Sequence, residues 1–121
     1  MREAVRTSSK HIELFDRFCA VCVDKDVDKV MEIFDDAAEI MENGLFLRGK
    51  SQIREFMARE APKLSDYVME KLNVFEKPDE IAVEWKNHYK YEAKVHDIFG
   101  VIVIKVRNGK IRRLNEYICT P

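Results

Sequence analysis

The sequence is poor in residues that interrupt or cross-link a chain: its 121 residues include 4 Gly, 3 Pro and 3 Cys. An odd number of cysteines does not build the disulfide framework of a small secreted domain. Residues 1–10 lack the apolar segment of a secretory signal. No apolar run approaches the ~18 residues of a membrane span. We therefore expect a cytoplasmic protein without a membrane partner.

An excess of charge of either sign is also lacking. The 21 Lys and Arg residues nearly balance the 22 Asp and Glu residues, so the formal net charge is -1. This balance removes the long-range attraction that draws basic proteins to nucleic acid, and we expect no nucleic-acid partner. Cys19 and Cys22 have the spacing of a redox pair but lie in a helical apolar stripe, so we interpret them as core cysteines. No motif indicates a metal or an organic cofactor.

The composition that remains, 46% hydrophobic and 36% charged, is typical of a folded chain. The length suits a single domain over residues 1–121. Helical spacing of apolar residues predicts three helices in the first half, capped by Ser8 or Ser9, by Asp26 and by Ser51. In the first helix the expected apolar stripe comprises Ile12, Phe15, Phe18, Cys19, Cys22 and Val23. Between the second and third helices, Asn43-Gly44 predicts a type I′ turn joining strands over residues 38–42 and 45–48.

The second half changes to a period of two residues, which is typical of strands. This alternation predicts strands over residues 67–76, 81–91, 95–107 and 111–119. Turns are expected at residues 77–80 and at Asn108-Gly109. Helices followed by a run of antiparallel strands indicate an α+β fold. A sheet that covers three helices must curl, and we expect the curl to leave a cavity.

Three segments resemble nuclear transport factor 2-like domains. Residues 26–37 (DVDKVMEIFDDA) resemble their second helix and the strand after it, residues 47–56 (LRGKSQIREF) the approach to their third helix, and residues 108–117 their last hairpin. Within that superfamily the chain is most similar to SnoaL-like polyketide cyclases and ketosteroid isomerase-like proteins, over about residues 8–119. The resemblance implies a cone-shaped fold, with three N-terminal helices packed on a strongly curved, mixed but mostly antiparallel sheet. It also implies a homodimer through the outer face of the sheet, around Val101 and Val103.

The family's functional positions can be followed one at a time. The general-base carboxylate of steroid isomerases falls on Glu42, which is an acid here. Their oxyanion-donating tyrosine falls on Phe18, and their second, protonated acid falls on Ile102, so both of these donors are missing. The resemblance therefore implies a pocket more strongly than it implies steroid isomerisation.

Strand parity predicts which polar side chains enter the pocket. We expect Glu42, Glu116 and His96 as catalytic groups, because a carboxyl in apolar surroundings has a raised pKa and can exchange protons near neutral pH. The expected ligand-binding residues are Phe18, Phe56, Trp85, Asn87, Tyr89, Ile102 and Leu114. Two alternatives remain open: Glu42 lies in water beside Arg48, or Glu116 only pairs with a cation.

Two functions follow from this site. The first is a cofactor-independent isomerase, cyclase or dehydratase that acts on a small apolar or cyclic organic molecule. The second is a non-catalytic, dimeric module that binds a ligand or another protein, which the missing oxyanion donors favour.

Overall fold

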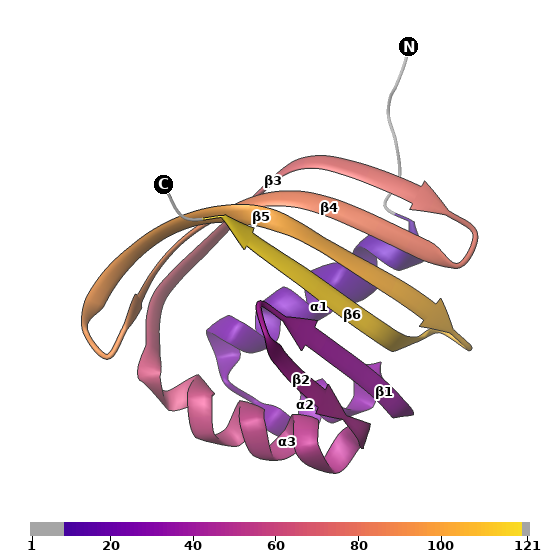
Figure 1. Cartoon of the computed structure of the whole chain (residues 1–121), viewed down its shortest axis with the longest axis horizontal. Coiled ribbons are helices and arrows are strands. Elements are labelled where there is room, and N and C mark those ends of the chain that lie inside the picture. The colour runs from indigo at the N-terminus through magenta and orange to yellow at the C-terminus, as the bar shows by residue number, and fades with distance from the viewer. Residues whose placement is uncertain (1–8, 120–121) are drawn as a thin grey trace.

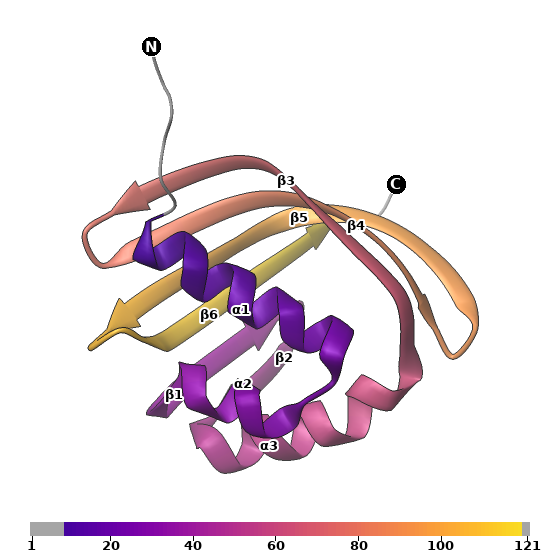
Figure 2. The ribbon, with the colours of Figure 1, turned by 180° about the vertical axis from the view of Figure 1, so that it is seen from behind.

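A computed structural model describes residues 9–119 as three helices covering one side of a curved six-stranded sheet (Figures 1 and 2). The helices are α1 (Lys10–Asp24), α2 (Val27–Ile33) and α3 (Gly49–Glu60), the last followed by a short 3-10 turn (Ala61–Lys63). The strands are β1 (Phe34–Glu42), β2 (Leu45–Arg48), β3 (Leu64–Lys77), β4 (Glu80–Tyr91), β5 (Lys94–Arg107) and β6 (Lys110–Cys119). The described chain is thus the predicted α+β fold.

The sheet is mixed, with the strand order β2-β1-β6-β5-β4-β3. β1 and β6 run parallel, whereas the other described neighbours pair antiparallel. The long strands β3 to β6 bend over α1, while α2 and α3 pack near β1 and β2 (Figure 2). Within residues 9–119, no helix is long and apolar enough to cross a membrane.

Local signals in the sequence account for the first two helix starts. The Ser9 hydroxyl accepts a hydrogen bond from the Ile12 N–H at 3.0 Å, and the Asp26 carboxylate accepts from the N–H groups of Asp28 and Lys29 in the first turn of α2. These are the caps expected for orphan N–H groups. The third start was predicted wrongly: Ser51 lies inside α3, and its N-cap is Arg48.

Two further predictions about the first half are wrong. Val23 is 58% exposed rather than part of the α1 stripe, and Leu14 is buried instead, because the stripe drifts around the helix. β1 begins at Phe34, four residues before the expected strand, because the chain leaves α2 directly in extended conformation. Cys19 is half-buried, and the side chain of Cys22 lies outside the described part of the chain.

Both Asn-Gly turns and the strand parity of the second half are confirmed. Asn43, Gly44, Asn108 and Gly109 all have positive φ, as type I′ turns require. Along β4, every second side chain is buried as far as Asn87. The side chains on either side of Asn87, Lys86 and His88, are exposed. The buried face joins the helices in one core, so the parity that buries the core also decides which side chains can enter a cavity.

Candidate functional site

A pocket of about 250 Å³ lies between the helices and the inner face of the sheet. Besides α1 and α2, the side chains that line it come from β1, α3, the 3-10 turn and the four strands β3 to β6. The lining consists of Phe18, Val27, Glu42, Phe56, Met57, Glu60, Ala61, Leu64, Tyr67, Met69, Asn87, Tyr89, Tyr91, Ile98, Ile102, Glu116 and Ile118. It is mostly apolar and aromatic with a few polar groups, as is typical of sites for small organic molecules.

Two carboxylic acids enter this pocket side by side. Glu42 on β1 is the register partner of Glu116 on β6, and Glu116 is in turn opposite Ile102 on β5. Register partners on neighbouring strands point to the same face of a sheet. The pairing therefore directs both carboxyl groups to the inner side.

An irregularity in β1 sets this register. Phe34 pairs with Ile111, but the next pair is Glu39 with Arg113, so four residues of β1 lie opposite one residue of β6. An even ladder from Phe34 would put a different residue opposite Glu116. The bulge is thus a condition for the meeting of the two acids.

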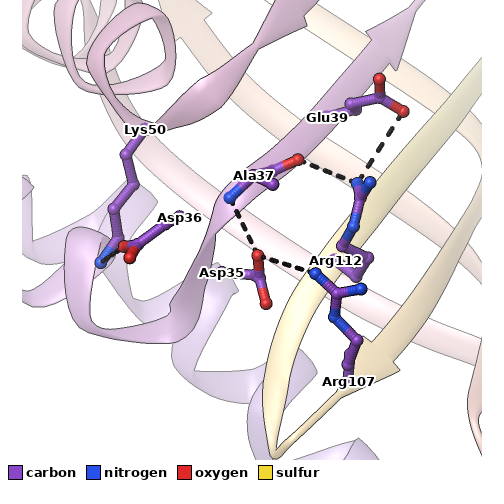
Figure 3. A network of polar contacts seen from close by, with 7 residues as sticks. All are labelled: Asp35, Asp36, Ala37, Glu39, Lys50, Arg107 and Arg112. Atoms are coloured by element: carbon purple, nitrogen blue, oxygen red, sulfur yellow. Dashed lines mark hydrogen bonds and ion pairs between the residues drawn. The ribbon is translucent and has the colours of Figure 1, made fainter.

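Polar contacts hold the bulge against β6 (Figure 3). The Arg112 guanidinium donates a hydrogen bond to the Ala37 carbonyl at 2.9 Å and lies 3.9 Å from the Glu39 carboxylate. The Asp35 carboxylate accepts a hydrogen bond from the Ala37 N–H at 2.9 Å and from Arg107 at 3.5 Å. The Ala37 hydrogen bond is the main reason that the pKa of Asp35 is lowered. These contacts satisfy backbone groups that the interrupted ladder leaves unpaired.

Asn43 fastens the other end of β1 to β6. Its side-chain amide donates to the Ile118 carbonyl at 3.4 Å, and its side-chain oxygen accepts from the Ile118 N–H at 3.3 Å. The Asn43 side chain therefore extends the ladder by one pair of hydrogen bonds, just beyond Glu42 and Glu116. The acids are fixed from both ends.

Burial makes the two acids weak. It raises the pKa of Glu116 to about 8, with the Glu42 carboxylate as the second cause. Burial also raises the pKa of Glu42. Burial first, and then the two carboxylates, raise the pKa of Tyr89. At neutral pH the site therefore contains a carboxyl that holds its proton, beside a second carboxyl.

Neither acid has a cationic partner within residues 9–119. Arg48, the candidate neighbour of Glu42, pairs instead with Glu39 at 3.3 Å. Among the residues that the structure describes, the pocket lining contains no Lys, Arg or His. The geometry therefore differs from both alternatives that the sequence left open. Glu42 does not pair with Arg48, and Glu116 does not pair with a cation among the described residues.

Glu60, the third acid of the lining, differs from this pair. It accepts a hydrogen bond from the Tyr91 hydroxyl at 2.6 Å and forms ion pairs with Arg59 and Lys63. The Tyr91 hydrogen bond is the main cause that lowers the pKa of Glu60. Its charge is therefore already compensated.

An unsatisfied amide lies in the same lining. Asn87 is 5% exposed, and its side-chain N–H donates to the Tyr67 hydroxyl at 3.1 Å. Its side-chain oxygen is buried and has no hydrogen-bond partner among the described residues. A buried acceptor without a donor is costly, so this oxygen is a candidate contact for a ligand.

Seven of the ten residues expected at the site line the pocket: Glu42, Glu116, Phe18, Phe56, Asn87, Tyr89 and Ile102. The other three lie elsewhere. Trp85 and Leu114 are 0% and 1% exposed and belong to the packed core, Trp85 lying against Gly100. His96 is opposite Tyr89 and stacks on its ring, with the centroids 5.2 Å apart. Parity gives the face of a strand, but it does not say how far along the strand the pocket extends.

The sequence interpretation missed the contribution of β3. Tyr67, Met69 and Leu64 line the pocket, and the alternation of Tyr67 and Met69 with exposed Val68 was the available signal. Tyr67 and Met69 also border a second hollow of about 230 Å³ between α1 and β3. No group of three or more His, Cys, Asp or Glu side chains suited to a metal occurs in the described residues.

Comparisons with known proteins agree with this architecture. A family model described as "SnoaL-like domain" matches residues 15–114. A putative isomerase from Rhodopseudomonas palustris superposes with a TM-score of 0.82 at 14% identity, covering 95% of this chain and 93% of that one. An LEH-like epoxide hydrolase from M. tuberculosis superposes with a TM-score of 0.80 at 14% identity, covering 91% of this chain and 83% of that one. A putative SnoaL-like polyketide cyclase from Jannaschia sp. CCS1 superposes with a TM-score of 0.77 at 12% identity, covering 98% of this chain and 91% of that one. No curated protein matches the sequence significantly.

Proposed function

Since the chain belongs to the SnoaL-like domain family, we propose that it binds a small, largely apolar organic molecule and transfers a proton on it without a cofactor. The reaction class is isomerisation, cyclisation or dehydration. The observation that carries this proposal is that two half-buried acids, Glu42 and Glu116, are register partners in an apolar pocket, with no counter-ion among the described residues. Proteins of this fold include isomerases, cyclases and epoxide hydrolases by their descriptions, so the site itself must decide between them.

The two acids have different roles, base and acid, because they differ in protonation state. The ionised carboxyl, assigned to Glu42, removes a proton from a carbon next to an electron-withdrawing group. The protonated carboxyl, assigned to Glu116 because burial and Glu42 raise its pKa to about 8, donates a hydrogen bond or a proton to the oxygen where charge develops. General acid–base catalysis of this kind accelerates a reaction by about 10²–10⁴-fold. Glu116 thus takes over the donor role for which Phe18 and Ile102 are unsuited.

Exchange of a carbon-bound proton tests the chemistry without knowledge of the natural substrate. The probe is 2-tetralone, a cyclic ketone, whose α-protons exchange for deuterium in D₂O and are followed by proton NMR. We expect the protein to accelerate exchange above the buffer rate and Glu42→Gln to remove most of the acceleration. Glu55→Gln, which changes an exposed carboxyl of α3, is the matched control and leaves the rate unchanged. Exchange at the buffer rate with the parent protein would contradict the catalytic proposal.

A second candidate is a non-catalytic dimeric module for a ligand or a protein partner. The missing donors at Phe18 and Ile102 favour it, and so does the outer face of the sheet, where Phe99 and Tyr117 are each 48% exposed. One outer row crosses all six strands in register and is mostly apolar: Phe46, Met41, Asn115, Val103, Ala82 and Phe75. An apolar centre of this kind is typical of homodimer interfaces.

Light scattering coupled to size-exclusion chromatography tests the dimer. We expect the mass of two chains for the parent protein and of one chain for Val103→Lys, which places a charge in the centre of the proposed interface. Lys105→Glu, farther along the same face, is the control. A monomeric parent protein would contradict the dimer and leave the pocket chemistry untouched.

A further inference from the structure

The pocket offers hydrogen-bond acceptors and negative charge but no positive charge. Of the 17 described residues in its lining, three are glutamates, three are tyrosines and none is Lys, Arg or His. Glu60 is neutralised by its own cations, whereas Glu42 and Glu116 are not paired among the described residues. The Asn87 side-chain oxygen adds an unpartnered acceptor that is itself buried.

The aromatic rings in the walls of the pocket favour a cation, as the hydrogen-bond acceptors also do. Phe18, Phe56, Tyr67, Tyr89 and Tyr91 surround the cavity, and the face of an aromatic ring attracts a cation. Two of these rings already have a cation over them: Arg59 lies 5.5 Å from the Phe56 centroid and Lys63 lies 5.8 Å from the Tyr91 centroid. A negatively charged ligand would meet the carboxyl pair with no compensating group, so this lining selects against carboxylates and phosphates.

We propose that the molecule bound in this pocket is a protonated amine with a small apolar or aromatic body. The inference rests on the proposed function only in taking the pocket as a small-molecule site, and it names the ligand class. Beside an ammonium both carboxyls are ionised, so Glu116 then accepts a hydrogen bond, and the ammonium, not Glu116, is the proton donor in the pocket. The ammonium N–H groups donate to the Glu42 and Glu116 carboxyls and, through a rotation of the amide, to the orphan oxygen of Asn87. A cavity of about 250 Å³ is smaller than the roughly 300–1,000 Å³ of drug-sized sites, so the body is limited to one or two rings.

The charge balance of the pocket couples the binding of a cation to the release of a proton. Around the carboxyl pair, the other titratable side chains of the described lining are Tyr67 from β3, Tyr89 and Tyr91 from β4 and Glu60 from α3. The described side chains that α1 and α2 contribute are Phe18 and Val27. None of these supplies a positive charge. A cation that enters beside Glu42 and Glu116 stabilises their ionised forms, so binding near neutral pH releases a proton to the solvent.

A set of three matched probes tests the ligand class: 2-phenylethylammonium, the neutral 2-phenylethanol and the anionic 3-phenylpropionate. Isothermal titration calorimetry at pH 7, in two buffers of different ionisation enthalpy, gives both the affinity and the number of protons released. We expect the ammonium to bind about tenfold tighter than the alcohol or better, as charged hydrogen bonds allow. We also expect net proton release with the ammonium alone and no measurable binding of the carboxylate.

Variants separate charge recognition from the existence of a pocket. Glu42→Gln and Glu116→Gln should each reduce the preference for the ammonium over the alcohol, and Glu55→Gln should leave it unchanged. Equal or tighter binding of the alcohol by the parent protein would overturn the amine inference while the small-molecule site stands. Binding of none of the three probes would overturn both.

Discussion

Glu42 and Glu116 face each other across β1 and β6, neighbouring strands that run parallel. The rest of the sheet pairs antiparallel, whereas this parallel pairing joins the strand that follows α1 and α2 to the last strand of the described chain. The account of function depends on that meeting. Two half-buried, neighbouring carboxyls without a cation among the described residues cannot both ionise at little cost, and one of them therefore keeps its proton at neutral pH.

Glu116→Gln should change the pH dependence of stability. The pKa of Glu116 is raised from 4.5 to about 8 in the folded protein, so its contribution to stability is full below pH 4.5 and is lost as the pH rises through 8. At about 1.4 kcal/mol for each pH unit, this loss amounts to roughly 5 kcal/mol at most. In urea unfolding at pH 4, 6 and 9, the free energy of unfolding of the variant should increase relative to that of the parent protein as the pH rises. A constant difference across that range would contradict the burial of the Glu116 carboxyl.

Arg112→Ala should loosen the bulge that sets the register of β1. The substitution removes the hydrogen bond to the Ala37 carbonyl and the ion pair with Glu39, and we expect a loss of about 1–2 kcal/mol in the free energy of unfolding. Arg107→Ala is the control, because it removes one exposed contact at 3.5 Å that is worth about 0–1 kcal/mol. Equal losses for the two variants in urea unfolding would show that Arg112 does not hold the bulge.

Gly100→Ala should be costly although the change is one methyl group. A Cβ at this position would overlap the Tyr117 backbone oxygen and lie 2.9 Å from Cζ2 of buried Trp85. Neither the backbone of β6 nor a fully buried indole can move freely, so we expect a loss of about 1–3 kcal/mol. Thermal unfolding measures the loss, and the fluorescence of Trp85, the single tryptophan, reports the displacement. A variant as stable as the parent, with unchanged fluorescence, would contradict this close packing.

The sequence predicted those parts of the fold that depend on local chemistry. Asn43 and Asn108 mark tight turns because asparagine followed by glycine tolerates positive φ, and alternation along β4 separates Asn87 from Lys86 without any knowledge of the partner strands. The inward direction of Glu42 and Glu116 follows from the same alternation. These predictions needed only the neighbours along the chain.

The parts that the sequence did not predict depend on contacts between distant segments. The four-against-one bulge in β1 is held chiefly by Arg112, which lies 75 positions after Ala37, the residue whose carbonyl it contacts. Trp85 was expected in the pocket but packs against Gly100, because a strand opposite a glycine leaves room for an indole. His96 stacks on Tyr89 instead of entering the cavity. No periodicity in a single strand contains this information.

The titration of Glu116 tests the central claim most directly. Carbon-13 NMR of the glutamate side-chain carboxyls between pH 3 and 10, with Glu116→Gln to assign the resonance, gives its pKa in the folded protein. The account predicts a midpoint near 8 that falls in Glu42→Gln, since the neighbouring negative charge is then gone. A midpoint near 4.5, unchanged by that substitution, would show that the two carboxyls do not share a buried site.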